Sequence, residues 1–124
     1  MRLLLDTHAL LWWLADEGLE AQARDAIADQ ANTVFVSAVS AWEISVKKAL
    51  GKLTAPADLE HQVHASGFLP LPVSIAHGLA AGQLARHHDD PFDRMLIAQA
   101  QAESLPLVTR DKRFSDYGVA LLAA

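Results

Sequence analysis

Short apolar runs that alternate with longer helical stretches constrain the fold of this chain more than any other feature. The clearest runs lie at residues 2–5, 34–36 and 107–109, and each is separated from the next by segments with helical patterning. Strands that alternate with helices in this way indicate βαβ units and a sheet covered on both faces. The sequence therefore predicts an α/β domain with a central, mostly parallel sheet of about 4–5 short strands.

The predicted elements follow one another without a break that would separate domains. We expect strands at 2–5, 33–36, 106–109 and 118–122, an extended piece at 68–71, and helices at 9–15, 20–31, 40–50, 57–66, 74–86 and 91–104. Prolines mark the limits of the extended piece, and Pro91 fits the first position of its helix. No linker, low-complexity run or repeat interrupts this pattern, so residues 1–124 are expected to form a single domain.

Apolar residues also recur at helical spacing in the predicted helix 40–50. The stripe consists of Trp42, Val46, Ala49, Leu50 and Leu53. Such spacing is typical of a face that packs on the core, which leaves Glu43 and Lys47 for another face. In the predicted helix 9–15, Trp12 and Trp13 point about 100° apart. Because both cannot comfortably face one small core, one of them is expected to meet a partner.

Composition and charge restrict the possible functions. There is no cysteine, which excludes disulfides, thiolate zinc sites and cysteine nucleophiles. No segment approaches the roughly 18 apolar residues of a membrane span, so we expect a soluble, cytoplasmic protein without a membrane partner. The net charge of −5 argues against binding nucleic acid by bulk electrostatics. An RNA substrate would require metal ions and a local basic rim, for which the candidates are Lys47, Arg94, Arg110 and Lys112.

Four acidic residues carry most of the functional information. Asp6 closes the first apolar run, Glu43 and Asp93 lie early in predicted helices, and Asp111 follows the run at 107–109. In an open parallel sheet these places meet in the crevice at the carboxyl ends of the strands. Four carboxylates gathered there would repel one another unless cations joined them. Hard divalent cations favour oxygen ligands, so the pattern predicts a Mg²⁺ or Mn²⁺ site.

Two of these acids also have local structural explanations. Asp6 could cap the helix that follows it. Ser40 and Glu43 have the spacing of a capping box, with Ser40 as the cap, and Glu43 could pair with Lys47 four residues later. The hydroxyls of Thr7 and Ser40 could alternatively orient water at a metal, although capping is the preferred role for Ser40.

The other two acids can be explained in the same way. Asp90 reads as a helix cap, with Asp93 favourably placed in the first helical turn, and Asp111 could start a turn. Capping explains each acid singly, yet it does not explain why acids stand at the ends of several elements on one predicted edge. For His87 and His88, a loop before the helix cap is preferred to a transition-metal cluster, because adjacent residues rarely ligate one ion. The role of His8 is open.

Four segments in this order resemble the PIN-domain nucleases, most closely the VapC-type toxins of toxin–antitoxin pairs. They are LDTH at 5–8, SAVSAWEI at 37–44, DPFDRMLIAQA at 90–100 and TRD at 109–111. The resemblance implies an α/β/α sandwich and a Mg²⁺- or Mn²⁺-dependent endoribonuclease that is the toxin of a type II pair. It also implies a homodimer and a cognate antitoxin that blocks the acidic cleft.

The resemblance also assigns residues. Asp6, Glu43, Asp93 and Asp111 match the family's catalytic, metal-binding acids. Asp93 matches the third acid better than Asp90, which looks like a supporting cap near the site. Asp116 is a further candidate for a carboxylate behind the metal ligands.

Other functions remain open from the sequence. A module of this family could bind RNA or an antitoxin without catalysis, and residue chemistry alone does not distinguish RNA from DNA as substrate. A phosphoacceptor signalling domain has a similar size, a doubly wound sheet and an acidic Mg²⁺ pocket. Such domains usually carry adjacent acids after the first strand, where this chain has Asp6 alone, although Lys112 could take the place of their late lysine.

Overall fold

A five-stranded sheet organises the protein, for which a computed structural model describes residues 1–124. Its strands are β1 (Arg2–Leu5), β2 (Thr33–Ser37), β3 (Leu69–Leu71), β4 (Leu107–Thr109) and β5 (Leu121–Ala123), in the order β3-β2-β1-β4-β5. Every pairing is parallel, which confirms the predicted α/β sheet. The extended piece that contains Pro70 is the edge strand β3, where a residue without an amide hydrogen is tolerated.

The helices connect the strands as the sequence predicts. They are α1 (Thr7–Ala15), α2 (Ala21–Ala28), α3 (Ala38–Ala49), α4 (Leu59–Ala65), α5 (Ile75–Gln83) and α6 (Pro91–Glu103). Their observed ends differ from the predicted ones by at most three residues. The prediction lacked one element, the 3₁₀ helix η1 (Lys112–Tyr117), which follows β4. No helix combines the length and the apolar character that a bilayer span requires.

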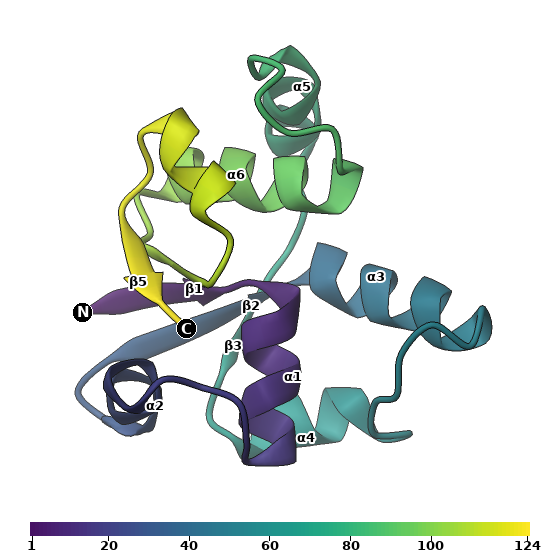
Figure 1. Cartoon of the computed structure of the whole chain (residues 1–124), viewed down its shortest axis with the longest axis vertical. Coiled ribbons are helices and arrows are strands. Elements are labelled where there is room, and N and C mark those ends of the chain that lie inside the picture. Colours follow the sequence, from purple (N-terminus) through teal and green to yellow (C-terminus); the bar gives the residue numbers. More distant parts are fainter.

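Two layers of helices enclose the sheet, as Figure 1 shows. On one face, the β1 side chains Leu3 and Leu5 join a core that also contains α1, α2 and α4 residues. On the other face, Leu4 packs with Leu96 and Ile97 of α6. Successive side chains of a strand point to opposite faces, so the run of three leucines supplies both cores. This arrangement is the α/β/α sandwich that was expected.

The packing of α3 corrects the sequence analysis. The predicted core stripe is wrong, because Trp42 is 61% exposed and Leu50 62% exposed. The buried face instead contains Val39, Ile44 and Glu43. Helix α3 begins at the carboxyl end of β2 and extends beyond the sheet (Figure 1). Its apolar stripe therefore has little core to contact, whereas its first turns border the acidic edge.

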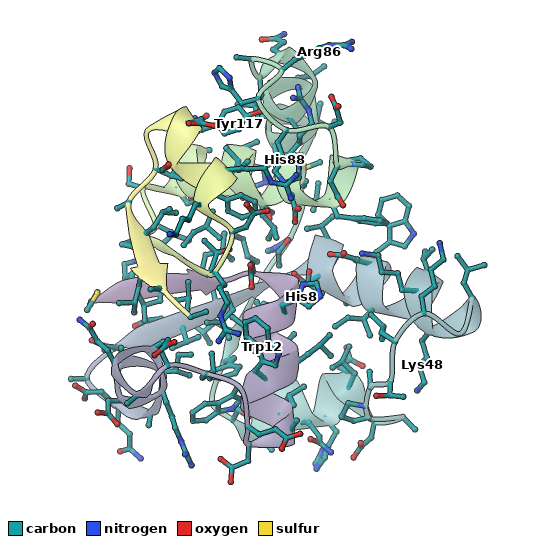
Figure 2. All side chains as sticks on the ribbon, in the orientation of Figure 1. His8, Trp12, Lys48, Arg86, His88 and Tyr117 are labelled. Carbon is teal, nitrogen blue, oxygen red and sulfur yellow. The ribbon has the colours of Figure 1, made fainter.

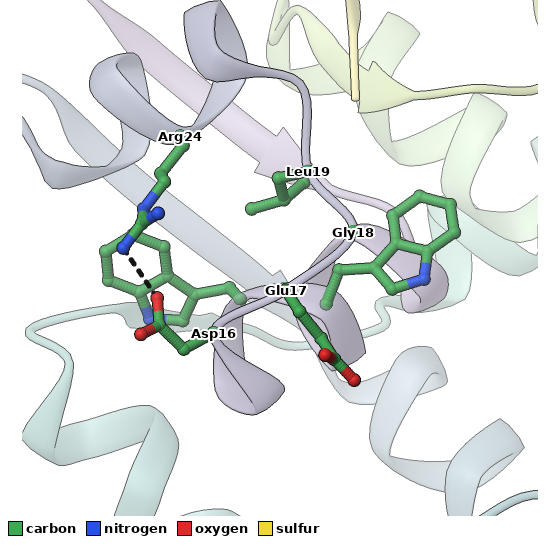
Figure 3. A pocket seen from close by; sticks show the side chains of 7 residues that line it. Asp16, Glu17, Gly18, Leu19 and Arg24 are labelled. Carbon is green, nitrogen blue, oxygen red and sulfur yellow. Dashed lines mark hydrogen bonds and ion pairs between the residues drawn. The ribbon is translucent and has the colours of Figure 1, made fainter.

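Trp12 and Trp13 both find neighbours within the chain. The Trp13 indole nitrogen donates to Ser66 Oγ at 3.2 Å. The guanidinium carbon of Arg110 lies 4.0 Å from the centre of the Trp12 ring. Both tryptophans line a small pocket that the Arg24–Asp16 ion pair borders (Figure 3). Each ring is half-buried, so both tryptophans make contacts within the chain, and the contact of one of them with a partner stays a prediction.

Candidate metal centre

Asp6 links the end of β1 to the start of α1. Its Oδ1 accepts a 2.8 Å hydrogen bond from the Ala9 amide, which makes it the N-cap of α1. Its Oδ2 accepts from the Thr109 hydroxyl at 2.6 Å, across the sheet from β4. Burial raises the pKa of Asp6, and these two hydrogen bonds oppose that rise. The predicted cap therefore exists, and it leaves the carboxylate at the carboxyl edge of the sheet.

Glu43 lies on the buried face of α3, only 3% exposed. Its Oε1 accepts from the Thr7 hydroxyl at 2.6 Å, and its Oε2 is paired with Lys47 Nζ. The predicted pairing at four-residue spacing is thus confirmed. The predicted capping box is wrong, because Ser37 caps α3 and Ser40 lies within the helix. The Ser40 hydroxyl is buried and lies 3.1 Å from Thr7 Oγ1.

Asp90 and Asp93 occupy the start of α6. Asp90 Oδ1 accepts from the amides of Phe92 at 2.8 Å and Asp93 at 3.1 Å, so the predicted cap is confirmed. The Asp93 carboxylate remains exposed by 21% at the site. Burial, followed by the negative charges of Asp90, Glu43, Asp6 and Asp111, raises the pKa of Asp93 to about 7. The fold therefore brings acids from β1, α3, α6 and the end of β4 close enough to repel one another.

Asp111 differs from the other acids because it already has a cationic partner. It follows β4 and caps η1 through the Arg113 amide at 2.9 Å. The Arg113 guanidinium lies 2.7 Å from Asp111 Oδ2. This hydrogen bond is the main cause that lowers the pKa of Asp111 to about 2. Asp111 therefore stays ionised beside Asp93. Its exposed partner Arg113, however, would compete with a metal ion for the same carboxylate oxygens.

His88 is the residue of the site that the sequence analysis missed. The loop at residues 84–90 turns it inward, and it is only 4% exposed (Figure 2). Its Nε2 lies 3.0 Å from Asp93 Oδ2 and 3.4 Å from Asp111 Oδ2. His87 instead lies outside and packs edge-on against Tyr117. The preference for a loop was correct for the backbone, but the sequence of this loop does not distinguish the inward His88 from the outward His87.

Comparison with known proteins identifies the family of the chain. Residues 3–120 match the sequence profile of the PIN domain. The chain belongs to the PIN domain family. Ribonuclease VapC22 of Mycobacterium tuberculosis is 26% identical over 121 residues, which cover 92% of this chain and 90% of that protein. The resemblance to VapC-type PIN domains is thereby confirmed.

Solved structures share the fold of this PIN domain at low sequence identity. DNA-bound VapBC from Salmonella typhimurium superposes with a TM-score of 0.71 at 20% identity, covering 98% of this chain and 97% of the other. DNA-bound VapBC2 from Rickettsia felis gives a TM-score of 0.68 at 17% identity, with 98% of both chains covered. VapBC-5 from Mycobacterium tuberculosis gives 0.62 at 19% identity, covering 99% of this chain and 98% of the other.

The four predicted basic residues of the rim have different surroundings in the structure. Lys47 lies at the site, and Lys112 is exposed on η1. Arg94, however, donates to the carbonyls of Ala81, Leu84, Ala85 and His88. Arg110 donates to the carbonyls of Ala124 and Gly18. Both arginines therefore hold the fold together, and contact of either with RNA stays a prediction.

Two further candidates, His8 and Asp116, are both exposed. His8 is exposed beside Trp12, with ring centres 5.8 Å apart (Figure 2). Asp116 is exposed on η1, and its role as a carboxylate behind the metal ligands stays a prediction.

The donor set of the acidic edge fits a hard divalent cation. The groups that converge there are carboxylate oxygens from Asp6, Glu43, Asp93 and Asp111, and such ligands suit Mg²⁺ and Mn²⁺. A cation would also remove the repulsion that disfavours ionised Asp93. Of these acids, Asp93 and Asp111 lie with a nitrogen of His88 within 4.8 Å of one another. Asp6 and Glu43 lie outside that group, and their charges contribute to the raised pKa of Asp93.

Proposed function

We propose that this PIN domain is a Mg²⁺- or Mn²⁺-dependent endoribonuclease, the toxin of a type II toxin–antitoxin pair. The main support is the gathering of four acids from separate elements at one edge of the sheet, where burial, followed by the charges of Asp90, Glu43, Asp6 and Asp111, raises the pKa of Asp93 to about 7. A protein that only binds RNA gains nothing from gathering negative charge where a phosphate must approach. The similarity to Ribonuclease VapC22 supports RNA as the substrate.

The proposed role of each residue follows from its surroundings. Asp6, Glu43 and Asp93 would hold the principal metal ion, and Asp111 would assist a second ion or its waters. Bound metal would activate water and stabilise the leaving oxygen of the phosphodiester. The Thr7 hydroxyl fixes Glu43, while Thr109 and the Ala9 amide fix Asp6, so both carboxylates are oriented before metal arrives.

Lys47 balances part of the charge on Glu43, and its side chain remains 30% exposed. Its pKa is raised, chiefly by its hydrogen bond to Glu43 and also by the charges of Asp90 and Asp93. A lysine held there stays cationic, and it can attract an RNA phosphate toward an otherwise acidic edge. Lys112 is the second basic residue that we assign to RNA contact.

We further propose a cognate antitoxin, a homodimer and a cytoplasmic location. The support for the antitoxin is that solved structures of this fold include VapBC2, VapBC and a toxin–antitoxin complex. The homodimer and the location follow from the resemblance to VapC-type toxins. Coexpression with the product of the neighbouring reading frame, followed by size-exclusion chromatography with light scattering, tests both assemblies. A toxin that stays monomeric and is not retained by that product would contradict them.

Cleavage of a labelled pool of structured RNA tests the activity. The purified protein is incubated with Mg²⁺ or Mn²⁺, and in parallel with EDTA. Asp93→Asn should abolish most cleavage, whereas Asp25→Asn, which removes an exposed carboxylate on α2, should cleave as the wild type does. Cleavage that persists in EDTA or in Asp93→Asn would refute the metal-dependent mechanism. Failure of folded, metal-loaded, antitoxin-free protein to cleave any RNA would favour a non-catalytic binding module.

A further inference from the structure

One buried polar atom at the acidic edge has no use in the mechanism above. His88 Nε2 lies 3.0 Å from an oxygen of Asp93 and 3.4 Å from an oxygen of Asp111, and it is fully aligned on neither of them. Buried polar groups are nearly always paired. A nitrogen that is aimed between two carboxylates without full alignment on either therefore requires an explanation.

The other ring nitrogen shows which atom carries the proton. His88 Nδ1 accepts a hydrogen bond from the Asp90 amide at 3.2 Å, so it must present a lone pair. In a neutral imidazole the proton then lies on Nε2. A nitrogen that carries a proton cannot ligate a metal ion. Histidines that ligate through one nitrogen usually donate from the other, and His88 has the opposite arrangement.

Burial excludes direct contact between this nitrogen and the substrate. Nε2 is inaccessible to solvent, so an RNA oxygen cannot reach it without displacing Asp93 or Asp111. The Nε2–H is therefore left with the two carboxylates as its acceptors. Since an N–H can be shared between two acceptors, its place between their oxygens suits a single bridging donor.

The surroundings of His88 hold the ring in this orientation. Its ring packs against that of Phe114, with centres 5.7 Å apart. Its carbonyl accepts from Arg94, which also binds carbonyls at the end of α5. Tyr117 fixes the same loop through the His87 amide and the Ala85 carbonyl. The loop thus presents His88 as a preformed donor.

We propose that His88 is a positioning residue that stays outside the metal coordination and holds Asp93 and Asp111 together through its Nε2–H. The Asp90 amide selects this tautomer. Asp90, the cap of α6, thereby acts through His88 on the positions of Asp93 and Asp111, which come from different elements. The inference rests on the proposed function in so far as the acids bind metal, but its tests do not require RNA cleavage.

Nuclear magnetic resonance tests the tautomer on the unaltered protein. Long-range ¹H–¹⁵N correlations of the His88 ring should show the proton on Nε2, both without metal and with saturating Mg²⁺. In the Mn²⁺-loaded protein, electron spin echo measurements should show no directly bound ¹⁴N. A proton on Nδ1, or a directly coordinated nitrogen that disappears in His88→Gln, would identify His88 as a ligand and overturn the proposal.

Metal affinity tests the positioning role. His88→Met fills the space without a donor and should weaken Mg²⁺ binding, measured by calorimetry, roughly 10- to 100-fold. His88→Gln restores an N–H donor and should recover most of that loss. Equal losses in both variants, or unchanged affinity in His88→Met, would refute the role, provided that thermal melts show folded protein. If the wild type bound no Mg²⁺ or Mn²⁺, the proposed function would fail, whereas the tautomer experiment would still decide the state of His88.

Discussion

The Thr7 hydroxyl donates a 2.6 Å hydrogen bond to Glu43 Oε1, which joins the start of α1 to the buried face of α3. Both groups are almost fully buried, so the bond orients Glu43 at a place where water cannot replace a lost hydrogen bond. A hydrogen bond to a charged acceptor is stronger than a neutral one. Thr7 therefore serves both the packing of two helices and the geometry of the metal site.

Replacing this hydroxyl by a methyl group separates the two roles. Thr7→Val keeps the volume but leaves Glu43 Oε1 without its donor, and should lower the free energy of unfolding by about 2 kcal/mol. Mg²⁺ affinity should fall as well, because the carboxylate is no longer oriented. Thr7→Ser keeps the hydroxyl and is the control. Urea unfolding in EDTA and calorimetry with Mg²⁺ measure the two effects, and equal behaviour of both variants would contradict the role of the hydroxyl.

Lys47 should compete with metal for Glu43. Its ammonium group is paired with Glu43 Oε2 and repels any cation that arrives at the cluster. Lys47→Met should therefore bind Mg²⁺ several-fold more tightly at low ionic strength, while RNA binding weakens because a phosphate contact is lost. Lys48→Met removes an exposed neighbouring charge and should change both much less. Weaker Mg²⁺ binding in Lys47→Met would show that the lysine organises Glu43 instead of competing for it.

The sequence predicted the fold well because the strand runs and the helical stretches alternate clearly. It predicted the position of Asp90 correctly because Pro91 marks the start of α6. It misjudged α3, since the spacing of large apolar residues does not reveal that a helix leaves the sheet and keeps a polar face buried at a site. The bridging place of His88 could not be predicted, because it depends on how the loop at 84–90 is held by Arg94, which is a tertiary contact.

The packing of Trp12 should require a glycine at position 18. Its φ of +100° disfavours any side chain, and a Cβ built there lies 2.7 Å from Trp12 Cδ1. Gly18→Ala should destabilise the protein by roughly 2–3 kcal/mol, from backbone strain and steric overlap. Gly51 also has a positive φ, of +70°, but open space surrounds its Cβ position. Gly51→Ala should therefore cost only about 1 kcal/mol, and similar melting temperatures for the two variants would refute the steric argument.

The raised pKa of Asp93 predicts how the stability of the metal-free protein depends on pH. The pKa is about 7 in the folded protein, against 3.8 for the ordinary group. The folded state therefore binds the proton more tightly, and stability is lost as the pH rises from 3.8 toward 7. Asp6 contributes in the same direction, because its pKa is also raised. The lowered pKa of Asp111 acts only below pH 3.8.

Asp93→Asn should remove most of this dependence. In EDTA it should be more stable than the wild type at pH 8, by at most about 4 kcal/mol, and the gain should shrink steadily toward pH 4.5. Mg²⁺ should reverse the order at pH 8, because it stabilises the wild type by binding ionised Asp93. Urea unfolding at several pH values, with EDTA and with Mg²⁺, measures this. A stability difference between the two proteins that stays constant from pH 4.5 to 8 would show that the Asp93 carboxyl is not destabilised by its neighbours.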